Sequence, residues 1–361
     1  MGDSTRDLPV THAELHAAIL GCARAAQVAE PAAEALADHI VEAHLRGVDT
    51  HGLRRLRPYL DRVAIGGVEA RAAPVIDEHG AVLRVDGRNG IGHHVARVAA
   101  DAAIAKARET GISVALVRNS NHFGFAGYYA SRIAAASMVG LVTSNGQVMV
   151  GPDGALRPIF SNDPLAISAP YAGGGMFELD LALSVTSRQN IVRAARLGQA
   201  IAPGMALDSD GVETTDADAA LAGLLLAFGG ARGFALLTAV EVLTGVLTGG
   251  AFADLVGSKE SAPDQPEATA HFMLAIDLDH ALGAELFNAR LLDLAERLQD
   301  LPMRDGAPQP RMPGTRRWRL RAERLAQAIP LAAQDFDDLL DLCRGYGVPV
   351  PAGWTRDTGG A

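Results

Sequence analysis

The hydrophobic pattern of this chain changes near residue 75, and that change constrains the fold more than any other feature. Before it, apolar residues recur at helical spacing. Thr11 and Glu14 form the pattern of a capping box, Pro31 suits the first turn of a second helix, and Gly47 marks the end of that helix. A third helical stretch follows near residues 56–60. The beginning of the chain is therefore predicted to be helical.

The centre of the chain alternates short apolar runs with helical stretches. This alternation favours an α/β fold of the α+β kind, in which helices pack on a mixed sheet built from residues 76–283. A helical domain built from both termini, residues 1–75 plus 284–361, is expected beside it. The expected strands are 81–85, 112–117, 139–143, 164–169 and 271–276, and the expected helices are 95–108, 128–137, 282–298 and 336–346.

Composition excludes several classes of protein. The 361 residues include 32 basic and 42 acidic side chains, so the net charge of −10 repels nucleic acid. Two cysteines, Cys22 and Cys343, are too few for a disulfide framework and favour a reducing cytoplasm. The polar start lacks a signal-peptide pattern. The most apolar stretch, 219–252, contains Arg232, Glu241 and several glycines, which predicts a buried helix with its approach loop rather than a membrane span.

Among the 11 histidines, His51 and His122 each lie in a predicted loop next to glycine, where a side chain can face a cleft. A structural role, with the ring nitrogens hydrogen-bonded inside the fold, explains either histidine about equally well. His12 and His16 are four residues apart on a helix, a spacing that can serve a metal, but no third ligand is evident. We expect exposed polar residues there and no metal site.

The strongest local constellation is Thr50-His51-Gly52, followed by Arg55. The hydroxyl can orient the imidazole, and the guanidinium can hold a carboxylate through two parallel hydrogen bonds. A general acid beside a carboxylate clamp is what reduction of a 2-oxo acid needs, because the oxyanion that develops must be protonated. Arg55 can equally be a surface residue, since Arg54 and Arg57 make this helix basic.

Two glycine-rich segments invite a phosphate-binding interpretation. Residues 87–92 read G-x-x-G-x-G rather than G-x-G-x-x-G, so an ordinary turn explains them better. His93 and His94, which follow, are expected to be surface or capping residues. Residues 229–233 open a helix, whose free N–H groups and Arg232 make a candidate anion site. A flexible loop leading into a buried helix is the alternative.

Taken together, these stretches resemble the malate/L-lactate dehydrogenase family of the second type, which also contains ureidoglycolate and sulfolactate dehydrogenases, 2,3-diketogulonate reductase and piperideine-2-carboxylate reductase. The matching motifs follow the family's order over nearly the whole chain. They are Thr50-His51-Gly52 with Arg55 and Tyr59, Ser120-Asn121-His122-Phe123-Gly124, Asp163-Pro164, Asp180-Leu181-Ala182-Leu183-Ser184, Pro203-Gly204, Asp208, Gly211, Thr214-Thr215, Gly229-Gly230-Ala231-Arg232-Gly233 and Pro313-Gly314.

The resemblance implies a non-Rossmann nicotinamide-binding domain, a homodimer, and an active site in a cleft between domains that takes NADH or NADPH. It implies that His51 donates the proton, that Thr50 and Asp180 hold it in a relay, and that Arg55 binds the substrate carboxylate. His122 would line the pocket at the nicotinamide. The cofactor contacts that the resemblance implies are His122, Ser120, Asn162, Asp180, Leu181, Ala182, Arg232 and Gly233.

The chain also departs from the family. It has Ser161-Asn162-Asp163-Pro164 for Gly-Thr-Asn-Pro, Asp180-Leu181-Ala182-Leu183-Ser184 for Asp-Met-Ala-Thr-Ser, Arg232-Gly233 for Lys-Gly, and Pro313-Gly314-Thr315 for Pro-Gly-Glu. Asp163 is expected to add a negative charge close to a phosphate. Three functions stay open: an NAD(P)-dependent oxidoreductase of a small 2-oxo acid and its 2-hydroxy acid, a reductase of a carboxylate-bearing cyclic imine, or a member without redox chemistry that transfers protons or binds a ligand.

Overall fold

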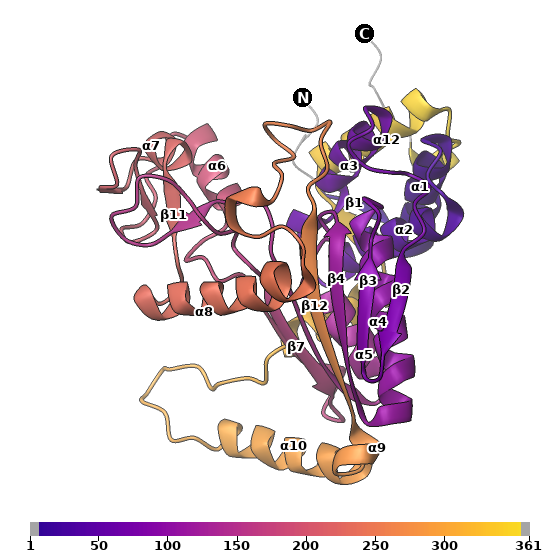
Figure 1. Cartoon of the computed structure of the whole chain (residues 1–361), viewed down its shortest axis with the longest axis vertical. Helices are drawn as coiled ribbons and strands as arrows, with labels where there is room; N and C mark the ends of the chain where they lie inside the picture. Colours follow the sequence, from indigo (N-terminus) through magenta and orange to yellow (C-terminus); the bar gives the residue numbers. More distant parts are fainter. Residues whose placement is uncertain (1–6, 355–361) are drawn as a thin grey trace.

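A seven-stranded mixed sheet forms the centre of the computed structural model, which describes residues 7–354 (Figure 1). The strand order is β2-β3-β4-β12-β5-β7-β8; β3 and β4 are parallel, and the other neighbours are antiparallel. The mixed α/β fold expected from the sequence is confirmed. The strands are β2 (Val75–His79), β3 (Val82–Asp86), β4 (Ile112–Ser120), β5 (Met138–Ser144), β7 (Leu165–Pro170), β8 (Met176–Leu181) and β12 (Thr269–Asp277).

Helices α4 (Gly92–Thr110) and α5 (Ala126–Ala135) pack on this sheet. The buried face of α4 is mostly alanine, and these small side chains let the helix approach β4 closely. Helix α4 ends at Gly111, whose φ of 81° is the left-handed conformation that glycine adopts without strain. The helices expected at 95–108 and 128–137 are therefore confirmed, with ends shifted by a few residues.

The two ends of the chain share one hydrophobic core. Helices α1 (His12–Ala25), α2 (Glu30–Leu45) and α3 (Leu56–Ala64) pack with α12 (Ala333–Tyr346), and β1 (Leu8–Val10) pairs antiparallel with β13 (Ile329–Leu331). The predicted capping box at Thr11 is formed. Cys22 and Cys343 meet in this core as free thiols with their sulfur atoms 3.7 Å apart.

Helix α10 (Ala284–Gln299) lies beside α9 (Leu278–Ala281), at the end of the sheet opposite α1 and α12 (Figure 1). It contributes no residue to the core of the terminal helices among the described residues. Helix α11 (Thr315–Ala326) instead contacts α2 and β8. The division into residues 1–75 plus 284–361 and 76–283 stays a prediction.

A lobe with its own core is built around Val150 and residues 183–240 (Figure 1). Its sheet has the order β10-β9-β11-β6. Helix α8 (Ala231–Glu241) and the turn that follows it expose one apolar side to solvent: Leu236, Val242, Val246 and Leu247 are 40–54% exposed. The expectation of a buried helix with its approach loop in 219–252 is wrong for that side. No helix in residues 7–354 is long and apolar enough to cross a membrane. The lobe's elements are β6 (Val150–Gly151), α6 (Arg188–Arg196), β9 (Ala206–Leu207), β10 (Glu213–Thr214), α7 (Ala217–Ala222), β11 (Leu224–Leu226), α8 (Ala231–Glu241) and a π-helical turn (Val242–Val246).

A buried ion network joins the terminal helices to the sheet. Arg46, just after α2, donates to Glu42 at 2.7 Å and to Glu178 of β8 at 2.8 Å. Glu178 also accepts a hydrogen bond from Arg317 of α11 at 2.9 Å. The Arg46 guanidinium lies over the ring of Trp318, 4.3 Å from its centre. Elements from three distant parts of the sequence are thus held together by paired charges.

Replacing Arg46 by methionine should lower the free energy of unfolding by about 3 kcal/mol, because Glu178 loses one of its two partners inside the protein. The side chain of Arg46 is only 4% exposed. The matched control is Arg344→Met, whose side chain is 72% exposed in a pair with Asp341 and should matter by less than about 1 kcal/mol. Urea unfolding of both variants measures this; equal effects would show that the network does not stabilise the fold.

Candidate active site

A cavity of about 280 Å³ lies where the terminal helices, the central sheet and the lobe meet. Many of the residues singled out in the sequence line it: Thr50, His51, Arg55, His122, Asn162, Asp180 and Ala182. These residues come from four separate stretches of the chain. The cavity is therefore the candidate active site.

A pair of short 3₁₀ turns, Asp49–His51 and Leu53–Arg55, presents the Thr50–Arg55 motif to this cavity. Between the turns, a Cβ on Gly52 would lie 2.3 Å from Nε2 of His44, so only glycine fits there. His44 Nε2 accepts a hydrogen bond from the Leu53 N–H at 2.9 Å, which fixes the second turn. Arg55 Nε donates to the Thr50 carbonyl at 3.0 Å, and its two terminal nitrogens have no partner within residues 7–354, so they can bind a ligand.

The imidazole of His51 lies nearly parallel to that of His122, with ring centres 5.6 Å apart and an angle of 18°. Its Nδ1 is buried and has no hydrogen-bond partner in residues 7–354. Burial and the positive charges of Arg55 and Lys259 lower the pKa of His51 to about 3. The His51 side chain is therefore neutral in the free protein at neutral pH.

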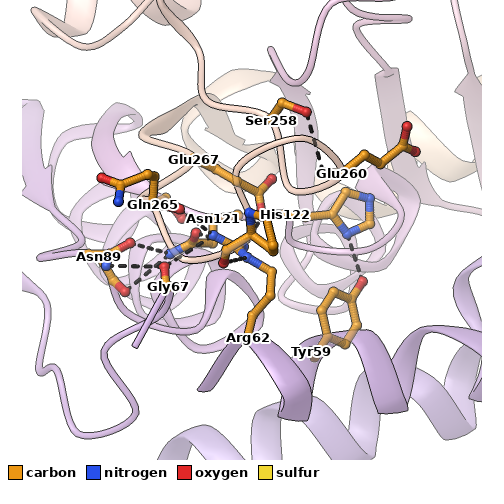
Figure 2. Close-up of polar contacts among 12 residues, drawn as sticks. Tyr59, Arg62, Gly67, Asn89, Asn121, His122, Ser258, Glu260, Gln265 and Glu267 are labelled. Carbon is orange, nitrogen blue, oxygen red and sulfur yellow. Dashed lines mark hydrogen bonds and ion pairs between the residues drawn. The ribbon is translucent and has the colours of Figure 1, made fainter. Parts of the chain in front are cut away.

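The hydrogen bonds of His122 define its tautomer. Its Nδ1 lies 2.6 Å from the Tyr59 hydroxyl (Figure 2). The same atom accepts a hydrogen bond from the Gly124 N–H at 3.4 Å. Because a backbone N–H can only donate, Nδ1 is an acceptor and the ring proton sits on Nε2. Burial lowers the pKa of His122 and raises that of Tyr59, so both stay uncharged. Tyr59 belongs to the sequence motif, but the sequence alone gave no reason to assign it this role.

Asp180 lines the cavity, but its bound partner is Arg317. Oδ2 of Asp180 accepts from Arg317 at 2.9 Å, while neither Asp180 nor Thr50 is hydrogen-bonded to His51 in the described residues. The relay through Thr50 and Asp180 stays a prediction. The sequence analysis did not identify Arg317, which lies in the first turn of α11, a helix that begins at Thr315.

Four of the implied cofactor contacts lie away from the cavity lining. Ser120 is buried and bonded to His271 at 2.8 Å, and Leu181 is 44% exposed. Arg232 and Gly233 open α8, where a Cβ on Gly233 would lie 1.5 Å from the Phe228 carbonyl oxygen. The start of α6 reaches the cavity instead. Ser187, Arg188 and Gln189 of that helix start line it, and the sequence analysis did not identify them.

Two other predictions about histidines can be compared with the structure. His93, expected at the surface, is 1% exposed and packs against the rings of His39 and Tyr59, because the start of α4 is covered by α2 and α3. That expectation is wrong. His16 pairs with Asp38 at 3.0 Å. Within residues 7–354 no three His, Cys, Asp or Glu side chains form a group that could hold a metal.

Asp163 does not place the expected negative charge near the cavity. Its carboxyl is fully buried, and both oxygen atoms lack a hydrogen-bond partner in the described residues. Burial, followed by the neighbouring Glu241, raises the pKa of Asp163 well above its usual value. The carboxyl is therefore held neutral, which corrects the expectation from the sequence.

Replacing Asp163 by asparagine should stabilise the protein increasingly as pH rises. Since the pKa of Asp163 is raised on folding, its contribution to stability is present at acidic pH and is lost as pH rises. The variant removes that loss, so its free energy of unfolding should exceed that of the wild type by about 1–3 kcal/mol at pH 8. The difference should be smaller at pH 5. Urea unfolding at both pH values measures it; a difference that does not grow with pH would contradict the neutral carboxyl.

Comparison with known proteins identifies the family. The family model described as malate/L-lactate dehydrogenase matches residues 10–340. The malate dehydrogenase of Pyrococcus abyssi is 31% identical over 88% of this chain and 90% of its own length. The (2R)-3-sulfolactate dehydrogenase (NADP(+)) of Chromohalobacter salexigens is 35% identical over 88% and 91%.

The solved structures agree with these matches. The crystal structure of Δ1-piperideine-2-carboxylate reductase from Pseudomonas syringae pv. tomato superposes with a TM-score of 0.84 and 32% identity. The superposition covers 93% of this chain and 99% of that one. This chain belongs to the malate/L-lactate dehydrogenase family and is an oxidoreductase of the dehydrogenase and reductase type.

Proposed function

We propose that this protein interconverts a small 2-oxo acid and the corresponding 2-hydroxy acid by hydride transfer with NADH or NADPH. The observation that carries the proposal is the meeting of Arg55 with two neutral imidazoles, His51 and His122, in one cavity. A carboxylate-binding guanidinium beside groups that donate hydrogen bonds and protons suits a carbonyl next to a carboxylate. Relatives named malate and sulfolactate dehydrogenase support the same chemistry.

The cavity has a donor set that fits a nicotinamide dinucleotide. Arg188 supplies a cation at the start of α6, where backbone N–H groups favour a phosphate, and Asn162 and Ala182 supply amide and backbone groups. We assign these three residues and His122 to the cofactor. The implied contacts Ser120, Leu181, Arg232 and Gly233 lie outside the cavity lining, which makes them weaker candidates. When bound, the cofactor supplies or accepts the hydride at C2 of the substrate.

Side chains of the protein bind the substrate and transfer the proton. Arg55 binds the substrate carboxylate with its free terminal nitrogens. His122 donates from Nε2 to the carbonyl oxygen, because Tyr59 and Gly124 occupy Nδ1. His51 gives a proton to that oxygen as it becomes an alcohol. A bound carboxylate offsets the charge of Arg55, one cause of the low pKa of His51, so substrate binding favours the protonated imidazole.

Reduction of a cyclic imine that bears a carboxylate is the second candidate. The observation that favours it is the structural match to Δ1-piperideine-2-carboxylate reductase, and the same residues would protonate nitrogen rather than oxygen. The non-redox alternative predicts that neither cofactor binds.

We also propose a cytoplasmic homodimer. The exposed apolar side of α8, together with Leu286 and Leu294 of α10, is a surface typical of an interface between subunits. The free thiols of Cys22 and Cys343 suit a reducing compartment. Sedimentation at twice the mass of the chain is expected, and a monomer would contradict the dimer.

Fluorescence titration with NADH and with NADPH tests the proposed function. We expect saturable binding of at least one of them, and oxidation of that cofactor, followed by its absorbance, in a screen of 2-oxo acids and cyclic imines. Turnover of imines alone would select the second candidate. Absence of binding by either cofactor in folded protein would reject both reductase proposals.

His51→Ala should lower kcat by about two to four orders of magnitude, the usual contribution of one positioned general acid, while the fold and cofactor binding are kept. His16→Ala is the matched control, because His16 lies outside the cavity. Wild-type turnover by a folded His51→Ala variant would remove His51 from the mechanism.

The pH profile is a further expectation for His51. The imidazole must be protonated for reduction, and its pKa in the free protein is about 3. Its protonated fraction, and with it kcat/KM for reduction, should therefore fall about tenfold per pH unit between pH 5 and 8. A profile that is flat over this range would contradict the assignment.

A further inference from the structure

The loop from Ser258 to Glu267 forms one wall of the cavity, and the buried Arg62 of α3 holds it there (Figure 2). The Arg62 guanidinium forms an ion pair with Glu267 and donates to the carbonyl oxygens of Pro263 at 3.1 Å and Gln265 at 2.9 Å. It also donates to Asn121 at 3.2 Å and to the Gly67 carbonyl at 3.1 Å. One side chain, Arg62, thus holds the loop in place.

Hydrogen bonds inside the loop define its first turn. The Ser258 hydroxyl accepts from the N–H groups of Glu260 at 3.3 Å and Ser261 at 3.1 Å. The Gly257 N–H donates to the Glu267 carbonyl at 2.8 Å, which closes the loop at its base. Lys259 lies within this turn and lines the cavity together with His51, Arg55 and His122.

Lys259 has no hydrogen bond or ion pair with any residue of the described chain, although it is partly buried. The neighbouring acids already have partners: Glu267 pairs with Arg62, and Glu260 with Arg188 at 3.7 Å. The charge of Lys259 acts on both imidazoles, since it is among the causes that lower the pKa values of His51 and His122. An unpaired ammonium group therefore faces the proposed reaction centre.

The other cations of the cavity differ in this respect. Arg317 is paired with Glu178 and Asp180, and Arg188 with Glu260. Arg55 and Lys259 alone, among the described cations that line the cavity, have no acidic partner. A buried charge without a partner is costly unless a ligand supplies the opposite charge. The carboxylate of a 2-oxo acid can pair with one of these two cations, which leaves the other for a second anionic group.

We propose that Lys259 binds a second acid group of the substrate, so that this enzyme prefers a 2-oxo acid carrying a further carboxylate or sulfonate. This assignment rests on the proposed function, in which Arg55 binds the carboxylate next to the carbonyl. None of the motifs that carry the family resemblance includes Lys259. It is a specificity residue on a loop that is positioned by Arg62.

The kinetic test compares substrates with and without the second acid group. We expect wild type to favour oxaloacetate or 3-sulfopyruvate over 2-oxobutanoate, and Lys259→Met to raise KM for the favoured diacid about 10- to 100-fold, the loss expected for a hydrogen bond to a charged group. KM for 2-oxobutanoate and the Kd of the cofactor should stay near wild type. Lys259→Arg should restore part of the preference, because it keeps the charge.

Arg55→Lys is the contrasting variant. It keeps a charge but loses the planar fork, so KM should rise for the diacids and for 2-oxobutanoate alike. The matched control is Lys106→Met, since Lys106 is the other lysine of the chain and is paired with Glu78 and Glu109. A Lys259→Met variant with an unchanged ratio of diacid to monoacid KM would overturn the proposal, as would a change confined to the Kd of the cofactor.

A direct binding measurement separates this inference from the proposed reaction. Because the chain has two lysines, NMR of protein labelled with ¹⁵N-lysine gives two side-chain signals, and Lys106→Met assigns them. Oxaloacetate or 3-sulfopyruvate, added with the oxidised cofactor so that no reduction occurs, should shift the Lys259 signal, while 2-oxobutanoate should not. If no 2-oxo acid turns over, the proposed function fails, and this shift still decides the role of Lys259: its absence with both diacids would overturn it.

Discussion

The pairing of Glu178 with two arginines is the interaction on which the arrangement of the active site depends. Its carboxylate is fully buried in β8, at the edge of the central sheet, and so must be neutralised by cations that other elements bring to it. Arg46 comes from the end of α2 and Arg317 from α11, and Arg317 also holds Asp180 in the cavity wall. Satisfying one buried charge therefore places the terminal helices, the sheet edge and one wall of the site relative to one another.

The electrostatics of the cavity also depend on which charged side chains have a partner of opposite charge. Most of its charged side chains are neutralised by one another, and burial keeps both imidazoles neutral in the free protein. The remaining positive charge belongs to Arg55 and Lys259. A cavity of this kind attracts an anion, and the bound anion in turn favours protonation of His51. Substrate binding and the readiness of the proton donor are thus linked through charge rather than through a hydrogen-bonded relay in the free protein.

The departures from the family pattern have local explanations. Asp163 stands where the family commonly has asparagine, and a buried neutral carboxyl resembles the amide in size and in lack of charge. Arg232 replaces the usual lysine at the start of α8, outside the lining of the cavity, while Arg188 at the start of α6 lies inside it. These changes therefore leave the cations that face the cavity in place.

The sequence by itself determined the features that depend on residues close together along the chain. The capping box at Thr11, the helix stop at Gly47, and the close spacing of His51 and Arg55 depend on interactions within a few residues, and each was predicted. The alternation of apolar runs and helical stretches predicted the sheet with its packed helices, and family motifs added the candidate residues from distant stretches. Tertiary structure decided the rest. The pairing of β1 with β13, the burial of His93, the contact of Arg317 with Asp180 and the exposure of Lys259 to the cavity all depend on segments that meet only on folding. Local spacing carries no record of such contacts, because a side chain's partner, its burial and the pKa that results are set by whichever distant element packs against it.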